Sequence, residues 1–589
     1  MKKVINRAEN LVLEMCSGIA LAHPELEFLP KYKVLKKKEL NAEKVTLISG
    51  GGSGHEPAHA GFVGKGMLDA AVCGDVFASP SQIQVYQAIR ATTGKKGALL
   101  IIKNYSGDIM NFRNAAHLAT EDGLEVDYVK VEDDIAVEDS LYTVGRRGVA
   151  GTVLVHKIAG AAAEEGRSLA EVKAVAEKAA ANVRSIGFAL TSCTVPAKGT
   201  PTLELGHDEI EYGVGIHGEP GTSREKLTDA DTLAGRMVID LLRDMQIETG
   251  FSGEIALLIN GFGGTPLQEL YLFNYSVTRE LAAKGITIDR TFVNNYMTSI
   301  DMAGISVSIM KLDNELKTLL SYESNAPAFK VAGPVDHVEF TDISTVADEN
   351  RQVSFGVETD PAFAVIENNK VTLNNLIYLV DKMSEVIIKN EVFFCDLDSH
   401  AGDGDFGMSV AKGFRQLKRE WRDILNQDSL TMGAFLHSCS LVIMEYCGGA
   451  SGPIWGSAFR AAARSAGERT ELTELTVSEF ADMMQAAVQG IQSTGERSFG
   501  RGAAVGDKTL IDALVPCADS WVESAKLDFD VKTAFIRGAQ AAVSGAKKTE
   551  DIVARMGRAG TVGERSLGYP DAGAYALGVI FTELAECLN

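Results

Sequence analysis

Several patterns that carry a known structural meaning are missing from this sequence of 589 residues. No apolar run reaches the roughly 20 residues that a membrane-spanning helix needs, so we expect no membrane association. The eight cysteines include no Cys-x-x-Cys pair, which argues for reduced thiols rather than zinc or disulfides. No Gly-x-x-x-x-Gly-Lys-[Ser/Thr] motif occurs, so any ATP must bind without a P-loop.

Basic residues are also too few to balance the acidic ones, and the formal net charge is −22. An acidic chain repels a phosphate backbone, so we expect no nucleic-acid partner. The amino-terminal stretch carries charges at Arg7, Glu9 and Glu14, unlike the apolar core of a signal peptide, so we expect a cytoplasmic protein. The hydrophobic fraction of 46% is that of a globular protein, and the length predicts about four domains.

What the sequence does contain is an unusually acidic stretch, Cys395–Asp405, with four aspartates and two glycines. Carboxylates at this density repel one another unless a cation lies between them. An EF-hand loop is excluded, because Ala401 and Gly407 stand where glycine and glutamate are required. The haloacid-dehalogenase phosphatase motif fits only as far as His400, where threonine or valine is required.

The remaining metal interpretation takes Asp398, Asp403 and Asp405 as ligands of Mg²⁺, which prefers oxygen donors and often shares phosphate groups with a substrate. Gly402 and Gly404 would let the loop fold back tightly. The simpler alternative is a solvated acidic loop.

A first candidate pocket follows the predicted strand Val45–Ile48, which leads into the glycine-rich segment Ser49–Pro57. This segment does not complete the Gly-x-Gly-x-x-Gly fingerprint of dinucleotide-binding proteins. It does place His55 at the carboxyl end of a strand, where open α/β sheets bind ligands. A flexible turn is the alternative.

A second apolar run, Ala98–Lys103, predicts another buried strand. Lys103 and Asp108 follow at its carboxyl end, and a helix is expected to begin near Asn111. A surface lysine and a helix-capping aspartate are the simpler interpretations. A further histidine, His217, is flanked by glycines on both sides, which lets another group approach its imidazole closely.

Strands and helices alternate over residues 1–330, with helices expected over 161–186 and 224–246. This pattern predicts a multi-domain chain whose first part is an α/β domain of two lobes, divided near 185–200. Prolines and weak periodicity over 331–370 predict a linker. From 371 to 589 the pattern is helical, beginning with an apolar face formed by Leu373, Leu376, Ile377, Val380, Met383 and Ile387.

Six segments together resemble the single-chain dihydroxyacetone (glycerone) kinases over nearly the whole chain. They are SGGGSGHEP at 49–57, KNYSGD at 103–108, GIHGEPG at 215–221, LDSHAGDGD at 397–405, GGASGP at 448–453 and GDKT at 506–509. The resemblance implies an α/β substrate domain followed by an all-helical nucleotide-binding barrel. It also implies a kinase that transfers the γ-phosphate of ATP, with Mg²⁺, to dihydroxyacetone or a short keto sugar such as erythrulose.

The resemblance assigns roles to the residues of the first part. His217 matches the histidine that attacks the ketone carbonyl and holds the sugar as a covalent hemiaminal, which selects ketoses over polyols. Asp108 would accept the proton of the attacking hydroxyl group, and His55 would orient that group. The pocket would also be lined by Gly52, Ser53, Gly54 and Lys103. A structural histidine is the alternative for His217.

In the helical part, Asp398, Asp403 and Asp405 would hold two Mg²⁺ ions across the phosphates. The nucleotide would be contacted by Phe406, Gly407, Met408, Ser409, Gly449, Ala450, Ser451, Leu510, Arg558, Asp571, Ala572 and Gly573. Two residues depart from the family pattern, because Phe406 and Tyr569 stand where histidines are usual.

Other functions compete with this one. A ligand-sensing regulator would keep the scaffold without turnover, and a phosphotransferase relay would use bound ADP as a cofactor. Some relatives also act as lyases on flavin dinucleotide. The family further suggests a homodimer formed through the N-terminal domains.

Overall fold

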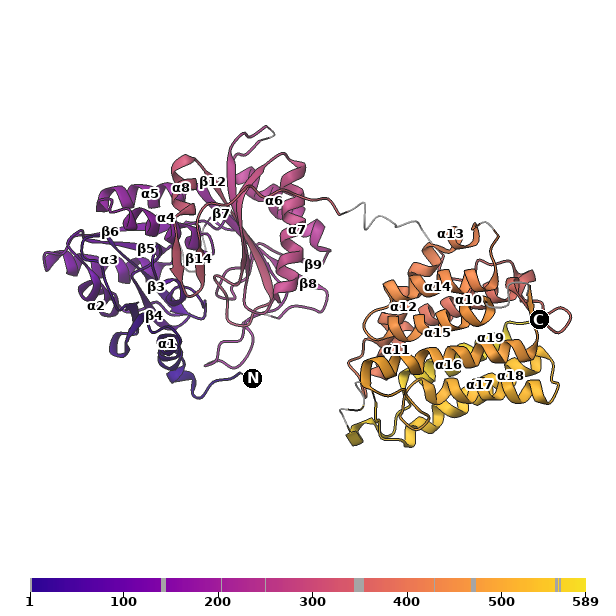
Figure 1. The fold of residues 1–589 in the computed structure, drawn as a ribbon. Helices are drawn as coiled ribbons and strands as arrows, with labels where there is room; N and C mark the ends of the chain where they lie inside the picture. The colour runs from indigo at the N-terminus through magenta and orange to yellow at the C-terminus, as the bar shows by residue number, and fades with distance from the viewer. Residues whose placement is uncertain are drawn as a thin grey trace. The chain divides into compact units, whose positions relative to one another are not determined.

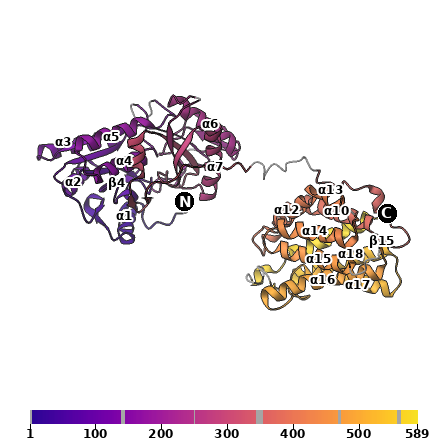
Figure 2. The same cartoon turned by 45° about the horizontal axis from the view of Figure 1, so that its top comes forward.

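The computed structural model describes residues 3–138, 145–202, 204–248, 250–343, 354–427, 429–467, 473–556, 560 and 563–589. The chain forms two compact units, Met1–Asp342 and Ile343–Asn589. The large sheets belong to the first unit, and long helices make up most of the second (Figures 1 and 2). None of the described helices combines the length and apolar character needed to span a bilayer.

The first sheet of unit 1 has the strand order β1-β2-β4-β3-β5-β6. Its strands are β1 (Leu26–Leu29), β2 (Val34–Lys37), β3 (Thr46–Ser53), β4 (Ala70–Val76), β5 (Ala98–Lys103) and β6 (Val126–Val131). Strands β4, β3, β5 and β6 run parallel, so their carboxyl ends lie at one edge. Helices α2 (Gln82–Thr92) and α3 (Ser106–Glu121) cover one face, and α4 (Thr152–Glu164) and α5 (Leu169–Asn182) cover the other (Figure 1).

The side chains of β5 alternate between the two faces of the first sheet, which explains why helices cover both faces. Leu99 and Ile101 pack in the core beneath α4 and α5, whereas Leu100 and Ile102 pack beneath α2 and α3. Successive side chains of a strand point to opposite faces, so a continuous apolar run requires helices on both sides.

The second sheet has the order β11-β10-β12-β7-β8-β9. Its strands are β7 (Val183–Ala189), β8 (Glu209–Tyr212), β9 (Ser223–Lys226), β10 (Glu254–Gly261), β11 (Thr287–Asn294) and β12 (Gly304–Leu312). Leu257 and Ile259 of β10 pack beneath α6 (Ala230–Asp244) and α7 (Leu267–Ala283). Ala256 and Leu258, on the opposite face, join the core that contains α4 and α8 (Asn314–Ser321). The two sheets therefore share one continuous core.

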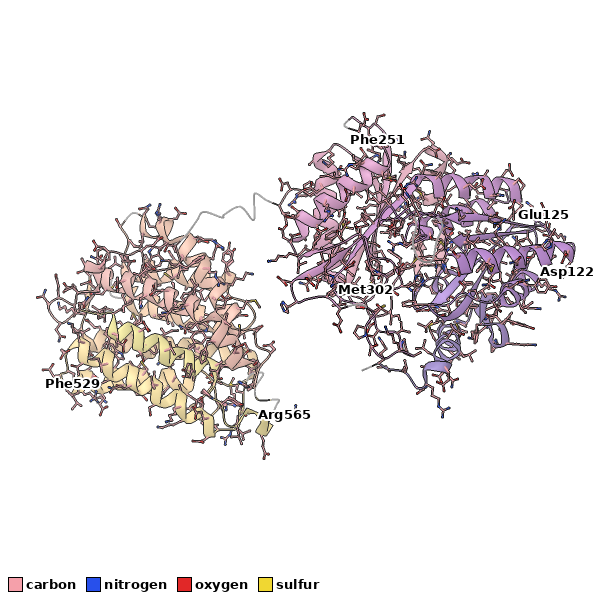
Figure 3. All side chains as sticks on the ribbon, turned by 180° about the vertical axis from the view of Figure 1, so that it is seen from behind. Asp122, Glu125, Phe251, Met302, Phe529 and Arg565 are labelled. Carbon is pink, nitrogen blue, oxygen red and sulfur yellow. The ribbon has the colours of Figure 1, made fainter. Side chains whose placement is uncertain are left out.

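The second unit is built from helices around a single apolar core. They are α10 (Leu373–Lys389), α11 (Glu391–Asp398), α12 (Phe406–Arg419), α13 (Trp421–Leu425), α14 (Met432–Tyr446), α15 (Ser451–Gly467), α16 (Val477–Phe499), α17 (Ile511–Lys526), α18 (Val531–Lys548) and α19 (Ala572–Glu586). Phe529 and Arg565 mark opposite ends of this bundle (Figure 3). The apolar face predicted for the first helix is confirmed, since Leu376, Ile377 and Val380 are buried.

The predicted fold class, an α/β part followed by an all-helical part, is confirmed. The single helix predicted over 161–186 is wrong. Gly166, with φ at +81°, ends the turn after α4, and Ser168 begins α5 with a reciprocal side-chain cap to Glu171. The chain then enters β7 at Val183.

Two further boundaries differ from prediction. The helix expected near Asn111 begins at Ser106, so Asp108 lies in its first turn, where a carboxylate favours the helix dipole. The helix expected over 224–246 begins only after Asp229, whose side chain accepts a hydrogen bond from the Thr232 amide. The domain and linker boundaries stay predictions.

Candidate functional site

The first candidate site lies where the two sheets of unit 1 approach each other. His55 follows β3, Lys103 ends β5 and Asp108 lies in the first turn of α3, all at the carboxyl edge of the first sheet. His217 comes from the second sheet, in the connection between β8 and β9. Its ring centroid lies 4.7 Å from that of His55 and 4.7 Å from that of Tyr105. Two histidines predicted from separate motifs are therefore in contact.

His55 is fully buried, and one polar contact defines its tautomer. Nδ1 lies 2.8 Å from the carbonyl oxygen of Thr298, which only accepts hydrogen bonds, so Nδ1 carries the proton. Burial, together with the nearby His217 and Lys103, lowers the pKa of His55 well below its usual value. Nε2 is buried without a hydrogen-bond partner among the described residues. His55 is thus a neutral imidazole whose Nε2 is able to accept a hydrogen bond.

His217 is more accessible, with 18% of its side chain exposed. Glu219 Oε2 accepts a hydrogen bond from the backbone amide of His217 and lies 3.7 Å from its Nδ1. Burial alone would raise the pKa of Glu219, but His217 and Arg147 outweigh it and hold the pKa at about 2. A carboxylate beside Nδ1 favours the tautomer protonated there, which makes Nε2 the nucleophilic nitrogen.

Asp108 forms a buried ion pair at the same edge of the first sheet. Lys103 Nζ lies 3.6 Å from Asp108 Oδ2, and both side chains are at most 3% exposed. The hydroxyl of Ser79 donates to Asp108 Oδ1. Lys103 Nζ also lies 4.9 Å from the ring of Tyr105, which contacts His217. A carboxylate held in this way is suited to accept a proton from a bound hydroxyl group.

The glycines of the segment Ser49–Pro57 leave room for the ring of Phe77, which borders this site. Gly54 has φ at +105°, and a Cβ there would lie 2.8 Å from the ring of Phe77. A Cβ at Gly52 would lie 2.7 Å from the backbone nitrogen of Ala78. The ring of Phe77 can therefore come within 5.1 Å of the ring of His217, measured between centroids.

The structure also places groups that the sequence did not predict. The hydroxyl of Ser53, a residue predicted to line the pocket, donates to the Gly74 carbonyl at 2.7 Å. Tyr105 lies in the segment KNYSGD and Glu219 in GIHGEPG, so their position beside Lys103, Asp108 and His217 is a sequence signal for a place in the site. Ser79 and Thr298 lie outside every recognised motif, and only the fold brings them here.

The second candidate site lies at one end of the helical unit, where α12, α15, α17 and α19 all begin. Helix N-termini offer backbone N–H groups and the positive ends of helix dipoles, which suit an anion such as phosphate. They surround a cavity of about 210 Å³. The predicted residues that line it are Asp398, Asp403, Asp405, Phe406, Ser409, Gly449, Ala450, Ser451, Leu510, Asp571, Ala572 and Gly573.

Two of the predicted nucleotide contacts, Gly407 and Met408, are not part of the cavity lining. Gly407 packs against α11, since a Cβ there would lie 2.0 Å from the carbonyl oxygen of Glu391. Met408 is 57% exposed. Arg558 lies outside the described residues. Lys508 and Thr509, from the GDKT segment, line the cavity although no role was predicted for them.

The acidic loop brings three of its carboxylates together in the lining of this cavity. Asp398, Asp403 and Asp405 each offer an oxygen, and these atoms lie within 4.8 Å of one another. Asp398 Oδ2 accepts a hydrogen bond from the Gly404 amide at 3.0 Å, which holds the loop closed. Burial and then the two other carboxylates raise the pKa of Asp398. A set of oxygen donors that repel one another fits Mg²⁺.

The loop before α19 forms the opposite wall. Asp571 accepts a hydrogen bond from the Ala574 amide at 2.8 Å and begins the helix, and burial raises its pKa to about 7. Lys508 Nζ donates to the Tyr569 carbonyl at 2.8 Å. The ring of Tyr569 stacks on that of His400 from the acidic loop, with centroids 3.8 Å apart and planes 9° apart. This stack joins the two walls.

Comparison with known proteins covers both units. Residues 17–328 match the Dak1 domain and residues 400–586 match the DAK2 domain. The chain is 36% identical to a putative 3,4-dihydroxy-2-butanone kinase of Solanum lycopersicum, over 98% of this chain and 96% of that protein. Its first part is 50% identical to the dihydroxyacetone-binding subunit DhaK of PTS-dependent dihydroxyacetone kinase 1 of Listeria innocua, over 54% of this chain and 95% of that subunit.

A solved structure resembles the whole chain. It is the dihydroxyacetone kinase of C. freundii in complex with AMP-PNP and Mg²⁺, which is 32% identical, with a TM-score of 0.60 and 99% of each chain covered. Since the two domain families follow each other in one chain and full-length relatives exceed 30% identity, the chain belongs to the single-chain dihydroxyacetone kinase family.

Proposed function

We propose that this protein transfers the γ-phosphate of ATP to a hydroxyl group of dihydroxyacetone or of a four-carbon ketose, with Mg²⁺ as cofactor. The observation that carries the proposal is the contact between His217 and the neutral, buried His55. Both histidines lie in a chain that also holds three converging carboxylates at a ring of helix N-termini. The kinase names of the relatives agree with it.

In the first step, His217 Nε2 attacks the carbonyl carbon of the ketose. A carbon–nitrogen bond forms, the carbonyl π bond breaks, and its oxygen takes up a proton while the imidazole loses the proton on Nδ1. The product is a neutral hemiaminal. Glu219, 3.7 Å from Nδ1, orients the ring for this attack and stabilises the transient positive charge. Glycerol has no carbonyl group and is not captured.

In the second step, the sugar hydroxyl oxygen attacks the γ-phosphorus of ATP, the bond from this phosphorus to the β–γ bridging oxygen breaks, and ADP leaves. Asp108 accepts the proton of the attacking hydroxyl group. Ser79 and Lys103 hold its carboxylate in place. His55 Nε2 accepts a hydrogen bond from the sugar and fixes its orientation, while Nδ1 stays bound to Thr298. Most of the rate then comes from in-line positioning rather than from strong acid–base chemistry.

In the helical unit, Asp398, Asp403 and Asp405 would hold Mg²⁺, which neutralises phosphate charge when bound. Backbone amides at Gly449–Ser451 would cradle the phosphate groups at the start of α15. The hydrogen bond between Asp398 and the Gly404 amide would keep the acidic loop closed over them.

A panel of trioses and tetruloses with ATP and Mg²⁺ tests the proposal, with glycerol as the control that lacks a carbonyl group. We expect phosphorylation of at least one ketose and none of glycerol. Absence of transfer to every ketose would contradict a kinase of this class.

A second candidate is suggested by the 50% identity of the first part to a PTS-dependent subunit. In that case the helical unit would retain ADP as a bound cofactor that a phosphotransferase relay recharges. Incubation with radiolabelled ATP followed by gel filtration separates the two functions. A kinase exchanges its nucleotide freely and turns over with ATP alone, whereas a relay enzyme retains ADP and does neither.

We further propose that the substrate domain spans residues 1–330, that 331–370 form a linker, and that the protein is a cytoplasmic homodimer. Limited proteolysis tests the boundaries, because cleavage should concentrate in the linker. Analytical ultracentrifugation of the full chain tests the dimer.

A further inference from the structure

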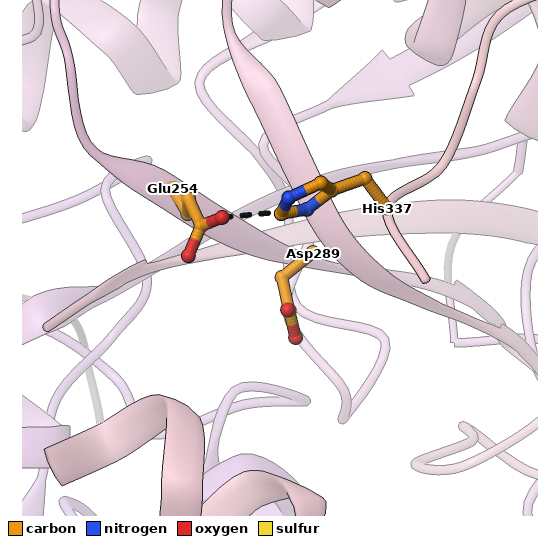
Figure 4. A group of neighbouring side chains, drawn as sticks. All are labelled: Glu254, Asp289 and His337. Atoms are coloured by element: carbon orange, nitrogen blue, oxygen red, sulfur yellow. Dashed lines mark ion pairs between the residues drawn. The ribbon is translucent and has the colours of Figure 1, made fainter. Parts of the chain in front are cut away.

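A second group of possible metal ligands lies in unit 1, away from the histidine site. Glu254 begins β10, Asp289 lies in β11, and His337 belongs to the segment that follows β14 (Phe329–Val331) (Figure 4). One ligand atom from each residue lies within 4.8 Å of the others. Glu254 Oε1 and His337 Nδ1 are 3.3 Å apart.

Lys317 forms ion pairs with only some of the carboxylate oxygens of this group. Its Nζ lies 2.6 Å from Glu254 Oε2 and 3.1 Å from Asp289 Oδ1, so it engages one oxygen of each carboxylate. A single ammonium group neutralises one of the two negative charges. Arg290, the next residue along β11, is a second cation that interacts electrostatically with Asp289.

A second, independent observation points to a bound ligand. It concerns Oδ2, the other carboxylate oxygen of Asp289. The Asp289 side chain is only 3% exposed, and its Oδ2 is buried without a hydrogen-bond partner among the described residues. An unsatisfied buried carboxylate oxygen costs free energy unless something binds it. Lys317 Nζ reaches Oδ1 of Asp289 but forms no hydrogen bond with Oδ2.

We propose that Glu254, Asp289 and His337 form a binding site for a divalent transition-metal ion of the zinc type. One imidazole and two carboxylates are ordinary zinc ligands, and three protein ligands leave a position for water. Bonds of about 2.1 Å in a tetrahedral site place ligand atoms about 3.4 Å apart, close to the separation of Glu254 Oε1 and His337 Nδ1. Mg²⁺ and Ca²⁺ prefer oxygen and suit the acidic loop instead.

The site would fix the segment that leaves unit 1. The Val338 amide already donates to the Ile288 carbonyl at 3.0 Å, which lays this segment beside β11. Arg290 Nη2 donates to the Gly333 carbonyl at 2.5 Å a few residues earlier. A metal ion joining His337 to β10 and β11 adds a third attachment, and this one depends on metal. The inference is independent of the proposed kinase activity.

The test measures zinc bound by the full-length protein in a large excess of Mg²⁺, which occupies the acidic loop. Wild type, His337→Ala, Asp289→Asn and Glu315→Gln are equilibrated with Zn²⁺, desalted and analysed for metal by mass spectrometry. Glu315 is the matched control, because it lies on α8 near Lys317 but pairs with Arg167. His337 is 54% exposed, so its replacement should leave the fold intact.

We expect wild type and Glu315→Gln to retain one more zinc ion per chain than His337→Ala and Asp289→Asn. Lys317→Met should tighten binding, because it removes the competing cation. At a zinc concentration a hundred times the Kd, hydrogen exchange at the Val338 amide should slow by up to about 100-fold in wild type but not in His337→Ala. Equal zinc content in wild type and His337→Ala would overturn the site. A zinc difference with unchanged exchange would overturn the attachment of the segment.

Discussion

His55 Nδ1 lies 2.8 Å from the carbonyl oxygen of Thr298, although 243 residues separate the two in the chain. The second sheet thereby sets the tautomer of a histidine that belongs to the first. Asn260, near the end of β10, holds the backbone of the two residues that precede Thr298. Its Oδ1 accepts hydrogen bonds from the Tyr296 and Met297 amides at 2.8 Å, and its Nδ2 donates to the Met297 carbonyl at 2.9 Å.

Replacement of Asn260 should therefore change the hydrogen bond between His55 and Thr298, although Asn260 does not touch His55. Asn260→Leu leaves these backbone groups unsatisfied, at a cost of about 2–4 kcal/mol, and releases Thr298. We expect kcat to fall at least tenfold, with a shifted pH profile and unchanged KM for ATP, measured by coupled assay. Asn260→Asp keeps the acceptor and should retain more activity. A purely structural role would lower stability without moving the pH profile.

Native mass spectrometry of the intact protein with excess ketose tests the covalent capture by His217. Wild type should carry the mass of one ketose per chain, and His217→Ala should carry none. His207, an exposed histidine before β8, supplies the matched control, and His207→Ala should keep the adduct. An adduct that persists in His217→Ala would contradict the assignment.

Loss of one carboxylate from the acidic loop should abolish most phosphate transfer. Asp403→Asn removes a ligand charge, and we expect kcat/KM to fall about 100-fold or more, equivalent to about 3 kcal/mol, with a raised Mg²⁺ requirement. Asp396, which is exposed in the same stretch, is the control, and Asp396→Asn should change activity less than about twofold. Steady-state rates measured over a Mg²⁺ titration compare Asp403→Asn with Asp396→Asn. Equal rates in the two variants would contradict the assignment of Asp403 as a ligand.

Stability of unit 1 should depend on pH through Lys157. This residue is fully buried, and its Nζ donates to the Leu319 carbonyl at 2.7 Å. Burial, with a smaller effect of Arg290, lowers the pKa of Lys157 to about 7. Between pH 7 and the usual lysine value, the unfolded chain binds a proton that the folded chain does not, so stability rises with pH across this window.

Lys157→Met removes this dependence, since methionine is uncharged. At pH 7 the variant should gain up to about 5 kcal/mol, less about 1 kcal/mol for the lost hydrogen bond, and the gain should shrink as the pH approaches about 10. Scanning calorimetry of the unit 1 transition from about pH 6.5 to about 9.5 measures it. A difference between variant and wild type that stays constant with pH would contradict the low pKa.

Contact between Tyr569 and His400 should matter for nucleotide binding. Tyr569→Ala removes a ring stack worth about 0.5–1.5 kcal/mol and frees the acidic loop from the opposite wall. We expect KM for Mg-ATP to rise several-fold, whereas Tyr569→Phe should stay near wild type. Tyr569→His restores the residue usual in the family and should also keep the stack. Equal KM values in Tyr569→Ala and wild type would show that the stack is dispensable.

The sequence predicted those parts of the sites that follow from local pattern. His55, Lys103 and Asp108 stand at the ends of apolar runs, and strand ends are where such sheets bind ligands. Thr298 and Ser79 could not be predicted, because their contribution depends on pairings between distant segments. The single helix expected over 161–186 is wrong for a local reason, since Ser168 and Glu171 form a capping box that begins a second helix.

In the helical unit the sequence predicted the acidic trio and most of the cavity lining. It did not predict that the loop before α19 would stack on His400, because this contact joins residues 169 positions apart and neither belongs to an aromatic cluster in the sequence. In the sequence, Tyr569 is only a departure from the family pattern. The structure gives it a partner.

The four helices that begin at the cavity place it at one end of the bundle. The turn at Phe529, between α17 and α18, lies at the end opposite Arg565 (Figure 3). Asp528 in this turn is exposed and already adopts a left-handed conformation, with φ at +56°. A fluorescent reporter or an affinity tag could therefore be spliced into this turn, at the end of the bundle that lies away from the cavity.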